Sequence, residues 1–257
     1  MSKTIGYLIA FILIGGAAIG YYFTQSDTAP LPPPPVAVVP PTPANVAPVT
    51  PAVPKEATVP ALPQLKDSDP LVGEALSALF GADLFKKYFR LKEIVRHIVV
   101  TIDNLPRKTA AARLFPTKPV GGKFITGGDE EYLVISAKNA ARYKPYVSMA
   151  EKVDAKTLVA AYTSLSPLFQ SAYQELGYPT SSFNDRLITV IDHLLKAPEP
   201  KGPVRLVQPN VMFQYEDEAL EAQSAGSKIM MRIGRDNAAK IKAKLREIRK
   251  ELVFKQG

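Results

Sequence analysis

The chain has 257 residues, 24 of them proline, and a formal net charge of +8. It contains no cysteine, which excludes disulfide bonds, thiol nucleophiles and cysteine-based metal sites. Residues 64–257 hold 30 of the 32 Lys and Arg and 22 of the 24 Asp and Glu, so this part carries the net charge and suits an anionic partner such as lipid head groups or an acidic polymer.

An uninterrupted apolar segment, Ile5–Phe23, predicts a transmembrane helix near the N-terminus. As a helix it would be about 28 Å long, close to the thickness of a bilayer's hydrocarbon core. Lys3 lies before the segment, and the far flank carries only Asp27 as far as Lys55, so the positive-inside rule places the N-terminus in the cytoplasm. A cleaved signal peptide is the alternative, but the apolar run is long for one. We therefore expect residues 1–28 to form a single-pass anchor.

Residues 29–63 form a proline-rich tract that holds thirteen of the prolines among Ala and Val, with almost no charge. Such a composition cannot build a hydrophobic core, and it predicts a disordered segment of polyproline II character. Fully extended, the tract would span about 100 Å at roughly 3.1 Å per residue. We interpret it as a linker. A role as a PxxP ligand is the alternative.

The rest of the chain, residues 64–257, shows mostly helical periodicity. The predicted helices cover about 69–80, 84–103, 136–152, 154–165, 167–176, 182–196, 217–233 and 236–254. We expect Pro145 to split or kink the third of these, and Pro167 to start a new helix. Two strand pairs are predicted, 123–126 with 132–135 and 204–207 with 211–215. The predicted fold class is therefore a mainly α domain with one or two small β-hairpins.

Several blocks of this part are similar to a known family. They are Val100–Pro106, Arg142–Tyr143, Phe169–Pro179, Phe183–Leu187, Ile191–Leu195, Ser224–Lys228, Arg232–Gly234 and Asn237. Through these blocks the chain resembles the proteobacterial family catalogued as domain of unknown function 3014. Ser227 stands where the family pattern has Gln. The resemblance implies an inner-membrane protein with an uncharacterised soluble domain, and it implies no activity.

Polar residues of the predicted helix at 182–196 are the candidate ligand-binding site. On a helical wheel Arg186 and His193 share one polar stripe, and Asp185 and Asp192 share the next. The candidate ligand-binding residues are Asn184, Asp185, Arg186, Asp192 and His193, with His193 as the acid–base group. The alternative is that these residues form salt bridges at the surface or between helices. Asn184 and Asp185 also suit the free N–H groups of a first helical turn.

Motifs for metal, cofactor or nucleophilic chemistry are missing from the sequence. The two histidines, His97 and His193, are far apart, and no H-E-x-x-H pattern is present, so we expect no metal site. The chain has no G-x-S-x-G, Walker A or G-x-G-x-x-G motif, and we expect no cofactor. We interpret Asp103 and Asn104, which precede Leu-Pro, as a turn at a helix end.

The last predicted helix is amphipathic and strongly basic. Its apolar stripe comprises Ile241, Leu245, Ile248 and Leu252. Its cations are Lys240, Lys242, Lys244, Arg246, Arg249 and Lys250, which we expect to face outward and bind an anionic envelope surface. The alternative is an ordinary solvated helix face, because Glu247 and Glu251 dilute the positive charge.

Together these features favour a non-enzymatic, membrane-tethered periplasmic interaction domain that acts as an adaptor in the cell envelope. The expected partners are the membrane, in which the protein is integral, and other envelope proteins or peptidoglycan. Because the domain is expected outside the cytoplasm, nucleic acid is not an expected partner. The alternative function is a cell-wall-active enzyme, a hydrolase that uses Asp or Glu carboxylates.

Overall fold

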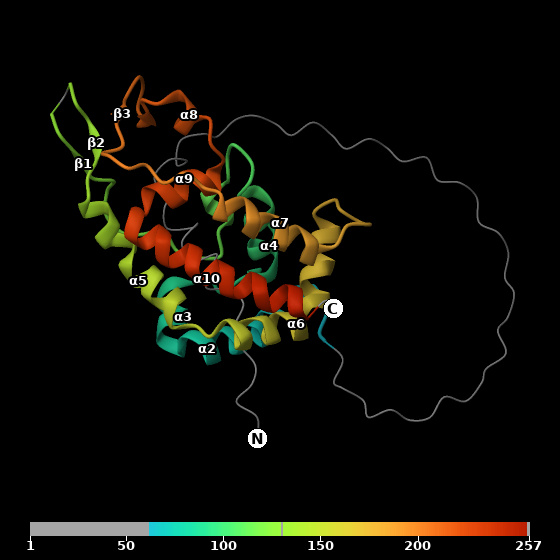
Figure 1. Ribbon diagram of the computed structural model, residues 1–257. Coiled ribbons are helices and arrows are strands. Elements are labelled where there is room, and N and C mark those ends of the chain that lie inside the picture. Colours follow the sequence, from blue (N-terminus) through green and yellow to red (C-terminus); the bar gives the residue numbers. More distant parts are fainter. Residues whose placement is uncertain (1–61, 130, 256–257) are drawn as a thin grey trace, which may run out of the picture.

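The computed structural model describes residues 62–129 and 131–255. This part of the chain is mainly helical with two small antiparallel β-hairpins, as predicted (Figure 1). The helices are α2 (Asp69–Phe80), α3 (Ala82–Tyr88), α4 (Ile94–Asn104), α5 (Lys138–Lys152), α6 (Ala155–Glu175), α7 (Phe183–Leu195), α8 (Glu218–Glu221), α9 (Ala225–Arg232) and α10 (Arg235–Phe254). The strands are β1 (Thr126–Gly127), β2 (Val134–Ile135), β3 (Leu206–Val207) and β4 (Gln214–Tyr215), and short 3₁₀ helices cover Leu65–Asp67 and Ala112–Leu114.

The predicted membrane anchor, residues 1–28, lies outside the described residues, as does nearly all of the predicted linker, residues 29–63. Within the two described ranges, no helix is both long enough and apolar enough to cross a membrane. The anchor and the linker therefore stay predictions from the sequence.

The C-terminal helix α10 packs against several other helices of the bundle. It contacts α5, α6 and α7, and Figure 1 shows it crossing the bundle diagonally. Its predicted apolar stripe, from Ile241 to Leu252, is buried in the main hydrophobic core. The apolar residues Phe183, Leu187, Ile191 and Leu194 of α7 are buried in the same core, with Ile191 only 1% exposed. Helix α4 also packs against α6 and α7.

A second, smaller hydrophobic cluster joins the two hairpins to α9. Its buried members are Leu206, Tyr215 and Met231. The side chains that pack against them include Phe124 of the segment before β1 and Phe213 of the segment before β4, whose ring centroids are 6.0 Å apart. The hairpins therefore form a layer with its own core beside the helical bundle.

The predicted helix at 84–103 is wrong, because the structure has two helices, α3 and α4, with an extended segment between them. Phe89 in this segment pairs with Thr117 in an isolated β-bridge, and Leu91 is 50% exposed. The carboxylate of Asp69 accepts hydrogen bonds from the backbone N–H of Glu93 at 2.7 Å and of Ile94 at 2.9 Å. Asp69 thus caps α4 from a distant part of the sequence, which the local pattern could not indicate.

The break predicted at Pro167 is also wrong, because α6 runs without interruption through it. Proline lacks the N–H that would bond to the carbonyl four residues earlier, which belongs to Thr163. The hydroxyl of Ser166 donates to that carbonyl at 2.8 Å instead. Helix α5 likewise continues through Pro145, so the predicted split does not occur there.

The predicted helix at 217–233 is divided into α8 and α9. Two capping side chains mark the division. Asp217 accepts from the N–H groups of Ala219 and Leu220 at the start of α8, and Ser224 accepts from the N–H of Ser227 at the start of α9. Each cap fixes a helix start, so one continuous helix is not formed here.

Candidate functional site

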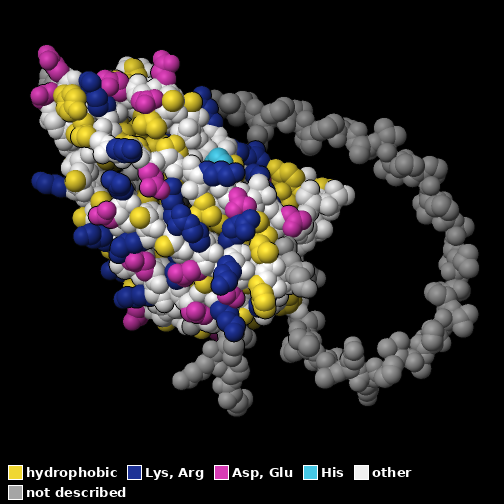
Figure 2. Space-filling model, in the orientation of Figure 1, with side chains coloured by type: hydrophobic (Ala, Val, Ile, Leu, Met, Phe, Trp, Pro, Cys, Tyr) yellow, Lys and Arg dark blue, Asp and Glu magenta, His cyan; other side chains and the backbone are white. Residues whose placement is uncertain are grey.

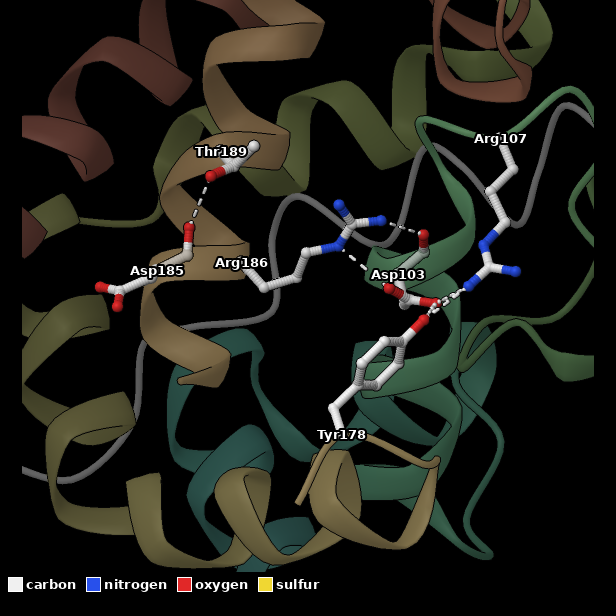
Figure 3. Close-up of polar contacts among 6 residues, drawn as sticks. All are labelled: Asp103, Arg107, Tyr178, Asp185, Arg186 and Thr189. Atoms are coloured by element: carbon white, nitrogen blue, oxygen red, sulfur yellow. Dashed lines mark hydrogen bonds and ion pairs between the residues drawn. The ribbon is translucent and has the colours of Figure 1, made fainter. Parts of the chain in front are cut away.

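Asp103 is the centre of a buried polar cluster in which three segments of the chain meet (Figure 3). Its side chain is 3% exposed. One carboxylate oxygen, Oδ1, accepts from Arg186 Nε at 3.0 Å. The other, Oδ2, accepts from Arg107 Nη2 at 2.5 Å and from the Tyr178 hydroxyl at 3.3 Å. Arg186 Nη2 also donates to the Asp103 carbonyl at 2.7 Å, so both the side chain and the backbone of Asp103 are engaged.

Local sequence features bring these three segments together. Asp103 lies in the last turn of α4, and Arg186 lies in the first turns of α7, which Ser182 caps by accepting from the N–H of Asp185 at 3.2 Å. Tyr178 follows α6, and its ring stacks on the ring of Tyr173 with centroids 4.5 Å apart. The polar cluster therefore joins the ends of α4 and α6 to the beginning of α7.

Asp185 does not take part in this cluster. Figure 3 shows its carboxylate directed away from Asp103, on the other side of α7. The Thr189 hydroxyl donates to the Asp185 carbonyl at 2.8 Å. Asn184 is half-buried on the same helix. Of the predicted ligand-binding residues, only Arg186 therefore bonds to Asp103.

The other two members of the predicted set point to different partners. His193 Nε2 lies 2.7 Å from the Ser224 hydroxyl. Burial lowers the pKa of His193, and the charges of Arg186 and Lys196 lower it further, so the imidazole is neutral at pH 7. Asp192 accepts two hydrogen bonds from Arg249, the longer at 3.0 Å, and these bonds lower the pKa of the Asp192 carboxyl.

The predicted site is therefore divided among three structural contacts, and this favours the alternative of salt bridges between helices. Arg107 and Arg186 bond to both carboxylate oxygens of Asp103, so this carboxylate belongs to an ion-pair network between helices. Among the residues that the structure describes, no group of three or more His, Asp or Glu could hold a metal ion. Asp103 was interpreted from the sequence as a turn residue, but its spacing of four from Arg107 was a signal for an ion pair.

The basic helix α10 differs from the predicted outward-facing cationic surface. Lys242 is 4% exposed, and its ammonium donates to the Ala197 carbonyl at 2.7 Å and to Glu199 at 2.5 Å. The expectation that Lys242 faces outward is wrong, because its position on the helix points it toward the chain that follows α7. Ion pairs at 4 Å or less also join Lys240 to Glu151, Lys244 to Glu247 and Arg249 to Asp192.

Only part of the predicted cationic surface remains available to a partner. Figure 2 shows Lys and Arg side chains interspersed with Asp and Glu on the face where α10 lies. Arg246 and Lys250 are exposed, and neither has an ion-pair partner within the described ranges. The prediction of anionic-surface binding therefore rests mainly on these two residues.

A cavity of about 470 Å³ opens at the other end of α10, and no sequence motif indicated it. It lies between β2, the loop 198–204 and the junction of α9 with α10. Its lining is mostly apolar, and the charged side chains that reach it are Glu199, Arg232 and Arg235. Figure 2 shows hydrophobic side chains gathered at the end of the molecule that carries the hairpins.

A second cavity, of about 270 Å³, lies between α4 and the end of α6. His97, Arg96 and Glu175 line it, and Arg96 is bonded to Glu175 at 2.9 Å. Burial lowers the pKa of His97, whose buried Nδ1 has no hydrogen-bond partner in the described structure. This cavity is smaller than the first, and its polar side chains include the His97 imidazole and the ion pair of Arg96 with Glu175.

Sequence comparison assigns the part of the chain that forms these contacts to a protein family. Residues 94–249 match the family described as Protein of unknown function (DUF3014). The chain belongs to this family. No curated protein and no solved structure shows significant similarity to it. Asp103, Tyr178, Arg186 and Ser224 all lie in the matched region, so the polar cluster and the contact of His193 are features of the DUF3014 domain of this chain.

Proposed function

We propose that this DUF3014 protein is a non-enzymatic interaction domain, tethered to a bacterial inner membrane and displayed in the periplasm as an adaptor. The observation that carries this proposal is the contrast between the two ends of the domain. The polar residues that suggested a reactive site bond to separate structural partners, Arg186 to Asp103 and Asp192 to Arg249, whereas the cavity beside β2 is open and mostly apolar.

The contacts of the carboxylates argue against the alternative of a cell-wall hydrolase. A glycoside hydrolase needs two carboxyl groups that face a common substrate, one of them able to donate a proton. Asp103 is held by Arg107 and Arg186, and Asp192 is held by Arg249. The hydrogen bonds from Arg249 lower the pKa of the Asp192 carboxyl, which suits ion pairing rather than acid catalysis.

The proposed location rests on the predicted anchor and linker. An apolar segment at Ile5–Phe23 and a proline-rich tract at residues 29–63 would hold the domain at up to about 100 Å from the bilayer. An adaptor benefits from such a tether because the linker sets the distance over which the domain searches for its partner.

The test between adaptor and hydrolase uses the full chain in membrane vesicles, incubated with isolated cell wall. We expect no release of soluble glycan or peptide fragments. Fragment release by the wild-type chain that is lost in Asp192→Asn would contradict the adaptor proposal and support the hydrolase. Release that persists in this variant would point to a contaminating enzyme, which a vesicle preparation without the protein identifies.

A further inference from the structure

The larger cavity lies at the seam between the two hydrophobic clusters of the domain. Met230 belongs to the main core, and the adjacent Met231 belongs to the cluster under the hairpins, and both side chains line the cavity. Val134 and Ile135 of β2 and Val204 of the crossing loop complete much of the apolar wall. Methionine side chains are flexible and adapt to irregular apolar ligands, so this wall suits an alkyl chain.

The volume of the cavity is in the range of ligand sites. About 470 Å³ lies within the range of roughly 300–1,000 Å³ that is typical of small-molecule pockets. Such pockets are usually apolar with a few polar groups that orient the ligand. Here the polar groups are concentrated at the α9–α10 junction, which gives the cavity one polar end.

The charge at this polar end is positive. Arg235 lines the cavity, is exposed, and has no ion-pair partner in the described part of the chain. Arg232 also lines it and is 6% exposed, with its guanidinium 5.5 Å from the centre of the Phe124 ring. Glu199 is the acidic side chain of the lining, and Lys242 bonds to its carboxylate. The lining therefore holds two arginines and one carboxylate, and this carboxylate bonds to Lys242 and lies within electrostatic reach of Arg235.

The start of α10 adds to this positive charge. The helix has 20 residues and begins after Gly234, which lines the cavity and has no side chain to cap the first backbone N–H groups. The N-terminal end of a helix carries a partial positive charge and favours anions. Asp236 in the same turn is not part of the cavity lining. An anionic group at this end would meet Arg235 and the free N–H groups together.

We propose that the cavity binds a single-chain amphiphilic carboxylate of the fatty-acid class. The alkyl chain lies along the apolar wall, and the carboxylate is held by Arg235 at the start of α10. This inference rests on the proposed function of an interaction domain, because it names the class of ligand that the domain takes.

The pairing of β2 argues against a peptide strand as the occupant. Strand β2 pairs with β1 on one side. On its other side Ile135 N–H donates to the Val204 carbonyl at 3.0 Å, and Leu206 N–H donates to the Leu133 carbonyl at 2.8 Å. Because both edges are paired, β2 has no edge to which a peptide could add as a strand.

The experiment is photo-crosslinking of the full chain in lipid nanodiscs with a diazirine-bearing palmitic acid, followed by mapping of the labelled peptides. We expect labels within residues 134–140 and 230–238. Unlabelled palmitate should compete for these labels about tenfold better than the alcohol of the same chain length, because only the carboxylate can form an ion pair with Arg235.

Two variants test the two ends of the cavity. Arg235→Glu should reduce the labelling of the cavity by about tenfold, while Arg246→Glu, an exposed cation farther along α10, should leave it unchanged. Ala137→Trp adds bulk at an exposed residue of the cavity lining and should also reduce labelling. The competition on the wild-type chain decides the proposal even where a variant fails to fold.

Three results would overturn the inference: no label on the cavity, equal competition by the alcohol, or full labelling of a folded Arg235→Glu variant. These results would leave the adaptor proposal standing, because the cell-wall assay tests it separately. Fragment release in that assay that is lost in Asp192→Asn would overturn the adaptor proposal whatever the labelling shows.

Discussion

Asp103 joins α4 to α7 through its bonds to Arg186. Its carboxylate is buried, and two guanidinium groups and a phenol hydroxyl bond to it. Removal of one partner of a buried ion pair costs about 3–5 kcal/mol, since the remaining charge is left without compensation. Arg107 is half-exposed and can turn to solvent, which places Asp103 at the lower end of this range.

We therefore expect Asp103→Ala to lower the free energy of unfolding by about 3 kcal/mol, measured by urea denaturation. Asp192→Ala is the matched control, because Asp192 also bonds to an arginine but the pair is partly exposed and screened by solvent. Its effect should be clearly the smaller of the two. Equal losses for the two variants would mean that the Asp103 cluster is no more important than a surface ion pair.

The two histidines make the stability of the domain depend on pH. Burial lowers the pKa of both His97 and His193 below the ordinary value of 6.5. The unfolded chain therefore binds protons below about pH 6.5 that the folded chain does not, so stability falls as the pH falls through this region toward the folded pKa values. We expect a lower urea midpoint at about pH 5.5 than at about pH 7.5.

The double variant His97→Gln with His193→Gln should have a flatter dependence on pH in the same interval. The glutamine side chain keeps hydrogen-bonding capacity without titrating, so the comparison isolates the charge. An equally steep loss of stability in the double variant would assign the effect to other groups. The carboxyl of Asp192 does not contribute there, because its lowered pKa moves its titration to more acidic pH.

At the scale of elements, α10 shows why a helical wheel identifies a buried stripe better than an exposed face. Its apolar residues are buried as predicted, but Lys242 is buried beside them. A long aliphatic stem can cross an apolar surface, and the ammonium then bonds to whatever carbonyl and carboxylate it reaches. The segment after α7 that supplies Ala197 and Glu199 could not be placed there from the sequence.

We expect Lys242→Ala to reduce the free energy of unfolding by about 1–3 kcal/mol, because the buried Ala197 carbonyl loses its donor. Arg246→Ala, on the exposed side of the same helix, should change it by less than about 0.5 kcal/mol. Thermal and urea unfolding measure both. A neutral Lys242→Ala variant would show that this lysine is not needed for packing.

Other elements were predictable to different degrees for identifiable reasons. The start of α7 was predicted because its cap, Ser182, is next to the helix in sequence. The start of α4 was not, because its cap is Asp69, about two helices earlier. In α6 the Ser166 hydroxyl bonds to the Thr163 carbonyl that Pro167 leaves without a backbone donor, and the general effect of proline on helices gives no indication of this. Residues from five elements and from the loop 198–204 line the cavity, so no local sequence pattern indicated it.

At the scale of the whole molecule, the domain has a polar and an apolar end. The polar cluster around Asp103 joins α4, α6 and α7, while the cavity opens where the hairpin layer meets α9 and α10. In the proposed function the polar cluster stabilises the fold, and the end with the cavity binds the ligand. A tether of residues 1–63 would present this binding end in the periplasm.

Membrane topology is the most direct test of the central claim, a tethered periplasmic domain. Two reporters are fused in turn after Gly257, one active only in the periplasm and one active only in the cytoplasm. The account predicts activity of the periplasmic reporter alone, and its loss when residues 5–23 are deleted, because that apolar segment is the proposed anchor. Activity of the cytoplasmic reporter alone in the full chain would contradict the account.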